Sequence, residues 1–79
     1  MIDIKTITKM EIDCFKFLEE LRQSGITNMY GAVPYIEDWF KDNGHYIGTP
    51  DSILTDEAHY LLSEWMRLYD TLIEEGLIV

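Results

Sequence analysis

Apolar residues recur at the spacing of an α-helix in three separate segments of this chain. Positions three or four apart lie on one side of a helix, so each segment has one apolar stripe and one polar side. The stripes are Met10, Cys14, Phe17, Leu18 and Leu21 in the first segment; Tyr35, Ile36, Trp39 and Phe40 in the second; Ala58, Leu61, Leu62, Trp65, Leu68, Tyr69, Leu72 and Ile73 in the third. We interpret Ile12 and Phe15 as lying opposite the first stripe.

The first helix has clear signals at both ends. Thr8 and Glu11 have the spacing of a capping box, so the helix should begin at Thr8. Ser24 and Gly25 should end it, with Gly25 in the left-handed conformation and Ile26 folded back onto Leu21.

The other boundaries follow from proline, glycine and capping residues. The second helix should begin at Pro34 and end in the segment 42–44, because proline is favoured in the first helical turn. The third should begin either at 49–51 or at 55–57, and Gly76 should end it. Residues 77–79 form an apolar tail, and the alternating isoleucines of residues 1–7 predict a short extended arm.

The segment between the first two helices predicts an ordered loop bracketed by glycines. Gly25 and Gly31 should both have positive φ angles, which glycine adopts without steric cost. The Asn28 side chain should bond to backbone groups of the turn, with Thr27 beside it and Pro34 closing the loop. The alternative is that Thr27 and Asn28 point into solvent as binding residues.

Together these patterns predict an all-α fold, a single helical domain over residues 1–79 with three helices. Joining the three stripes predicts one core, made of Leu18, Leu21, Trp39, Phe40, Leu62, Trp65 and Tyr69.

Charge excludes one class of function. Six basic residues face fifteen acidic ones in 79 residues, for a net charge of −9, and the basic residues are scattered. Contacts with negatively charged phosphates dominate the affinity of a protein for nucleic acids. Because this acidic protein repels phosphates, we expect no direct nucleic-acid binding. No window approaches the roughly 20 apolar residues of a membrane span. A single cysteine, Cys14, fits a reducing, cytoplasmic compartment.

No residues form a recognisable catalytic, cofactor or metal site. The acidic residues come in adjacent pairs, which point about 100° apart on a helix and so do not face one substrate. Neither His45 nor His59 has a Ser or Cys nucleophile at a position that would suggest a catalytic pair. Cys14 lies on an apolar stripe. We therefore expect a protein that is not an enzyme and needs no cofactor or metal.

A protein-binding surface is the remaining hypothesis. Carboxylates beside exposed aromatics can pair with a basic groove on a partner, in imitation of nucleic-acid phosphates; the plainer interpretation is a solvated helix surface with the aromatics in the core. The candidate partner-binding residues are Tyr30, Tyr35, Glu37, Asp38, Tyr46, Asp56, Glu57 and Glu64, and among the aromatics Tyr30 or Tyr46 is expected to be exposed.

One segment resembles a known family. Ser24-Gly-Ile-Thr-Asn-Met-Tyr-Gly-Ala-Val-Pro-Tyr-Ile36 is similar to a motif in very small proteins of tailed bacteriophages. In these proteins a helix ends in Ser-Gly, a Thr-Asn-Met-aromatic-Gly-Ala turn follows, and the last helix carries Glu-Ala and Trp-Met, as Glu57-Ala58 and Trp65-Met66 do here. The chain departs from the pattern between Phe40 and Glu57, where its loop is longer.

The resemblance implies a phage gene product that acts in the bacterial cytoplasm; the family carries no assigned activity. The function we expect is an accessory protein that binds and inhibits a host or anti-phage defence protein. A helix-turn-helix DNA-binding regulator and a structural or assembly protein are the alternatives, and self-association is left open.

Overall fold

The protein is all-α, as its sequence predicts. The computed structural model describes residues 1–78, with Met29 as backbone only, and contains α1 (Lys9–Ser24), η1 (Met29–Gly31), α2 (Val33–Asp42) and α3 (Asp51–Glu74), where η1 is a single 3-10 turn. These described residues include no strand.

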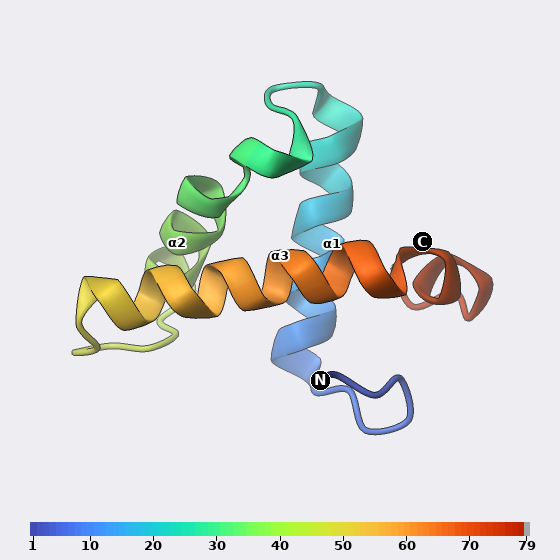
Figure 1. Ribbon diagram of the computed structural model, residues 1–79, viewed down its shortest axis with the longest axis horizontal. Coiled ribbons are helices and arrows are strands. Elements are labelled where there is room, and N and C mark those ends of the chain that lie inside the picture. The colour runs from blue at the N-terminus through green and yellow to red at the C-terminus, as the bar shows by residue number, and fades with distance from the viewer. Residues whose placement is uncertain (79) are drawn as a thin grey trace.

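The three helices form a flat arrangement. α3 runs across α1 and lies beside α2, with η1 in the connection between α1 and α2 (Figure 1). The molecule measures 35 × 30 × 18 Å. A helix with its side chains is about 10–12 Å wide, so the shortest dimension leaves room for only two layers of helix. Much of every helix therefore stays in contact with solvent.

Both predicted ends of α1 are confirmed. The Thr8 hydroxyl accepts a hydrogen bond from the Glu11 amide, and the Glu11 carboxylate accepts one from the Thr8 amide. Gly25 has φ 70°. The expected contact of Ile26 with Leu21 is wrong, since Ile26 is 65% exposed. The Ile26 amide donates to the Ser24 hydroxyl, and the chain then leaves α1 toward η1.

The loop after α1 is an ordered turn built around Asn28. Both the side-chain oxygen and the carbonyl oxygen of Asn28 accept hydrogen bonds from the Gly31 amide, at 2.9 and 3.0 Å. The predicted role of Asn28 is therefore confirmed. The positive φ predicted for Gly31 is wrong, because the residue completes a 3-10 turn. A side chain there is disfavoured by space: a Cβ would lie 2.6 Å from the Thr27 hydroxyl oxygen, so the Thr27 side chain would have to shift.

The remaining helix ends are close to their predicted positions. α2 begins at Val33, one residue before Pro34. α3 begins at Asp51, the earlier of the two alternatives, and Thr55 does not interrupt it. The Thr55 hydroxyl donates to the Asp51 carbonyl oxygen inside the helix. After α3 the chain turns back, and Ile78 is buried as expected for an apolar tail. Val79 lies outside the described residues.

The core joins all three apolar stripes. Its buried members are Ile2, Cys14, Phe15, Leu18, Leu21, Ala32, Val33, Ile36, Phe40, Leu54, Ala58, Leu61, Leu62, Trp65, Leu68, Leu72 and Ile78. Trp39 and Tyr69 pack against it half-buried. The placement of Phe15 opposite the stripe is wrong: it lies three residues before Leu18, on the same side of α1.

The segment before α1 is not an extended arm. Asp3 closes a turn, because its carbonyl oxygen accepts from the Thr6 amide at 3.0 Å and its carboxylate accepts from the Lys5 amide at 2.9 Å. The Ile2 side chain is buried against the core. Within residues 1–78 we find no helix both long enough and apolar enough to cross a lipid bilayer.

Candidate partner-binding surface

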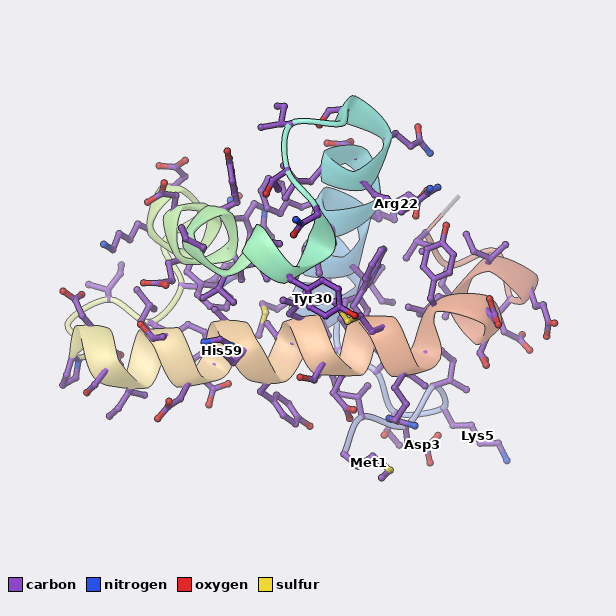
Figure 2. All side chains as sticks on the ribbon, turned by 45° about the horizontal axis from the view of Figure 1, so that its top comes forward. Met1, Asp3, Lys5, Arg22, Tyr30 and His59 are labelled. Carbon is purple, nitrogen blue, oxygen red and sulfur yellow. The ribbon has the colours of Figure 1, made fainter. Side chains whose placement is uncertain are left out.

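The candidate tyrosines differ widely in exposure. Tyr30 on η1 is 86% exposed, and its ring projects from η1 in the direction of α3 (Figure 2). Tyr35, in the first turn of α2, is partly exposed. Large exposed aromatic side chains are frequent centres of protein interfaces. Tyr30 is thus the aromatic residue most available to a partner.

Tyr46 has a structural environment instead. Its ring packs edge-on against Phe40 with the centroids 4.9 Å apart, and its hydroxyl donates to Glu57 at 3.4 Å. Its φ of 57° is unusual for a residue other than glycine. The ring contact and the hydroxyl bond offset that strain. Burial, followed by the nearby Glu57, raises the pKa of Tyr46. Of the two tyrosines that the sequence offered as exposed, it is therefore Tyr30 that is exposed, whereas Tyr46 is half-buried.

The carboxylate of Glu37, which belongs to α2, and that of Glu57, which belongs to α3, lie on different sides of α3. Glu37 accepts a hydrogen bond from the Thr55 hydroxyl at 3.3 Å, whereas Glu57 accepts one from Tyr46. Residues 55 and 57 are two apart, so their side chains point about 200° apart around the helix. The candidate residues therefore do not form one continuous patch.

Glu64 is the clearest correction among the candidates. Its side chain was expected on the solvent side of α3, but the residue is 7% exposed. Its carboxylate accepts from Arg67 at 2.8 and 3.1 Å and from the Ile2 amide. The Arg67 bond, opposed by desolvation and helped by the Ile2 amide, lowers the pKa of Glu64 to about 2. With these bonds made, Glu64 is not available to a partner.

A second buried carboxylate repeats this arrangement on α1. Glu19 is 6% exposed and accepts hydrogen bonds from Arg22 at 2.6 Å and Gln23 at 3.0 Å. The Arg22 bond is the largest cause that lowers the pKa of Glu19. The Arg22 guanidinium also lies 5.5 Å from the centre of the Tyr69 ring. Glu19 and Glu64 each have an arginine three residues later, which is the sequence signal that the acidic-surface interpretation missed.

The carboxylates that stay exposed on α2 and α3 form what we call the outer acidic surface. Its members are Asp38, Asp42, Asp51, Asp56, Asp70 and Glu74. Asp56 and Asp70 are fourteen residues apart, so they lie on nearly the same line along α3, separated by about 21 Å.

Few positive charges oppose this surface. Lys9, Arg22 and Arg67 are each paired with a carboxylate of their own helix, at 2.8, 2.6 and 2.8 Å. Among residues 1–78, the cations without such a pair are Lys5, Lys16 and Lys41, which lie in three different parts of the chain. The outer acidic surface is therefore largely uncompensated.

The remaining reactive groups among residues 1–78 are one thiol and two imidazoles on different elements. Cys14 is fully buried, and desolvation raises its thiol pKa to about 12, so the thiolate nucleophile is suppressed. His45 stacks on Trp39 with ring centroids 5.1 Å apart, and His59 lies exposed on α3 (Figure 2). In the part of the chain that the structure describes, no three His, Cys, Asp or Glu residues are grouped to hold a metal ion.

Comparison with known proteins found no match. No family model, no curated protein and no solved structure is similar to this chain.

Proposed function

We propose that this protein is a non-enzymatic accessory protein of a tailed bacteriophage that binds and inhibits a host or anti-phage defence protein in the bacterial cytoplasm. The observation that carries the binding role is the outer acidic surface, whose carboxylates stand on two adjacent helices with few opposing cations. The phage setting rests on the resemblance of the segment Ser24–Ile36 to small phage proteins.

The partner that suits this surface is a protein with a basic groove for nucleic acid. Complementary charges steer the encounter of two proteins and set their register. The carboxylates at Asp56 and Asp70 are about 21 Å apart along a rigid helix, which is a spacing that an extended basic groove can span. Tyr30 would add an aromatic contact beside the charges.

The experiment is a binding assay with matched charge-reversal variants. The test variant carries Asp56→Lys and Asp70→Lys, both on the outer acidic surface. The control carries Glu20→Lys and Glu75→Lys, which change the net charge equally but lie elsewhere. Each protein is immobilised and exposed to the heparin-binding fraction of a bacterial lysate, and bound proteins are identified by mass spectrometry and titrated.

The proposal expects one partner to bind the parent and the control, and to bind the test variant at least about tenfold more weakly. Its binding to the parent should fall with rising salt and with added duplex DNA. Equal loss in test and control variants would mean that net charge alone is responsible. If only Tyr30→Ala abolished binding, the nucleic-acid mimic would be wrong.

A further inference from the structure

The amino-terminal residues occupy a defined site on the side of α3 away from Tyr30. In Figure 2, Met1, Asp3 and Lys5 lie on one side of α3 and Tyr30 on the other. The Ile2 amide donates to Oε1 of Glu64, and Nη2 of Arg67 donates to the Ile2 carbonyl oxygen at 2.7 Å. Both backbone polar groups of one residue are thus bound by two side chains of α3.

Glu64 and Arg67, which we call the clamp, also hold each other in place. Nε of Arg67 donates to Oε2 of Glu64 at 2.8 Å and Nη2 donates to Oε1 at 3.1 Å, and Oε1 also accepts the Ile2 amide. A hydrogen-bonded ion pair with both groups oriented is a preorganised binding element. Because it bonds to backbone atoms, it can hold any extended residue whose side chain fits beside it.

The side-chain position next to the clamp is selective. The Ile2 side chain is 6% exposed and occupies an apolar seat in the core; an open hollow of about 410 Å³, lined by residues 1–4 with Arg67, Leu68 and Thr71, remains beside the bound segment. A branched aliphatic side chain fits this apolar seat, whereas a charged one would be buried unpaired at a large cost.

Few hydrogen bonds tie the bound segment to the helices, although Ile2 belongs to the core and Ile4 and Ile7 pack against it. Apart from the clamp bonds, the hydrogen bonds of residues 1–7 run within the segment, from Lys5 and Thr6 to Asp3. α1 carries its own cap at Thr8, so its start does not depend on the segment. We call residues 1–7 the strap.

We propose that the clamp and the apolar seat form a peptide-binding site, filled in one molecule by its own strap and exchangeable for the strap of a second copy. A second copy supplies the one sequence that the structure shows to fit the seat. The six residues from Ile2 to Ile7 reach about 20 Å when extended, enough to cross to a neighbouring molecule. Exchange of an identical segment between protomers is a common route to dimers.

The chain's own strap competes strongly with any added peptide. A tethered segment acts at an effective concentration on the order of millimolar, so the site is hidden in the parent at lower concentrations. Ile2→Asp in the full-length chain weakens the strap and leaves the clamp intact. Ile2→Ala is the milder variant for use if Ile2→Asp unfolds, as judged by circular dichroism.

The experiment adds a peptide of residues 1–7 to the isotope-labelled variant and follows its amide signals by NMR. We expect saturable shifts in the region 64–71 of α3. A scrambled peptide of the same composition, and the peptide with Ile2→Asp, should bind at least about tenfold more weakly, since each loses the buried aliphatic contact. Adding Arg67→Gln to the variant should remove the shifts while the helical content stays.

Two results would overturn the proposal. One is a folded variant that shows no shifts with the parent peptide at millimolar concentration, or equal shifts with the scrambled peptide. The other concerns the second copy. Sedimentation of the parent protein near millimolar concentration should reveal a dimer, and the Ile2→Asp variant should not form it. A parent protein that stays monomeric at that concentration would exclude strap exchange.

Discussion

At the scale of single residues, Trp65 shows how one side chain can hold most of this core. It is 3% exposed and packs against Tyr69 with ring centroids 4.9 Å apart. Its indole Nε1 is buried without an acceptor among the described residues. Trp65→Ala should cost about 3–5 kcal/mol, close to the whole stability of a domain of this size. A urea denaturation series measures this, and an unchanged midpoint would contradict the core assignment.

The orphan indole group adds a second expectation for the same position. Trp65→Phe keeps an aromatic ring and removes an N–H whose burial without a partner costs about 1–3 kcal/mol. Its loss of stability should therefore be clearly smaller than that of Trp65→Ala under the same conditions. If the two variants unfolded at the same urea concentration, the aromatic ring retained by Trp65→Phe would contribute nothing to stability, which would contradict the core assignment.

Substitution of Gly31 tests whether steric space, rather than the backbone φ angle, favours glycine at this position of the loop. Gly31→Ala places a Cβ about 2.6 Å from the Thr27 hydroxyl oxygen, so it should destabilise by about 1–3 kcal/mol. Thr27→Ala removes that oxygen, and the double variant should be more stable than the sum of the single changes predicts. Chemical denaturation of the four proteins measures the coupling, and strict additivity would contradict the clash.

Residue positions were predictable where the neighbours in sequence decide them. The bonds of Thr8 and Asn28 and the left-handed Gly25 depend on residues at most three positions away. The pairing of Glu64 with Arg67 could have been read from their spacing, but its burial could not, because its other partner Ile2 is 62 residues distant and the burial depends on where the strap packs.

At the scale of elements, the capping box fixes the start of α1. Thr8→Ala removes the acceptor for the Glu11 amide and should cost about 1 kcal/mol. Thr6→Ala is the matched control, since its hydroxyl makes only one long contact, 3.4 Å, to the Asp3 carbonyl oxygen. Thermal unfolding should separate the two variants by several degrees. Equal melting temperatures would show that the cap contributes nothing measurable.

The three helices were predictable because each combines an apolar stripe with a stop signal. For the third, the sequence allowed two starts, and α3 takes the longer form, which begins at Asp51; inside it the Thr55 hydroxyl donates to the Asp51 carbonyl oxygen. The strap escaped prediction for a different reason. Alternating isoleucines favour an extended arm, but Asp3 forms a local turn and the clamp holds Ile2.

At the scale of the whole molecule, the candidate site was predictable only in part. The excess of acidic charge follows from composition, and the exposure of Tyr30 was expected. The division of Glu37 and Glu57 between two sides of α3 follows from how α2 and the loop after it pack, which no local pattern specifies.

The bonds that Glu64 accepts, first from Arg67 and then from the Ile2 amide of the strap, should make stability depend on pH. The pKa of Glu64 is lowered from 4.5 to about 2, so its ionised form is favoured in the folded state. A lowered pKa contributes stability above the unfolded value, and this contribution is lost as pH falls from about 4.5 toward 2. Glu64→Gln should therefore lose its stability difference from the parent over that range. Asp70→Asn, which is exposed, is the control, and a difference that stays constant with pH would contradict the assignment.

The charge of the whole molecule leads to a last prediction, which concerns the rival regulator. A helix-turn-helix protein places a helix against DNA and needs cations along that face. Here Lys5, Lys16 and Lys41 are separated, and the exposed side of α3 carries Asp56, Asp70 and Glu74. The protein should therefore fail to shift duplex DNA in a gel at about physiological ionic strength. The double variant Asp56→Lys and Asp70→Lys is an informative comparison, because it removes charge from the surface that would repel DNA. A salt-sensitive shift by the parent would refute the prediction and favour the regulator over the nucleic-acid mimic.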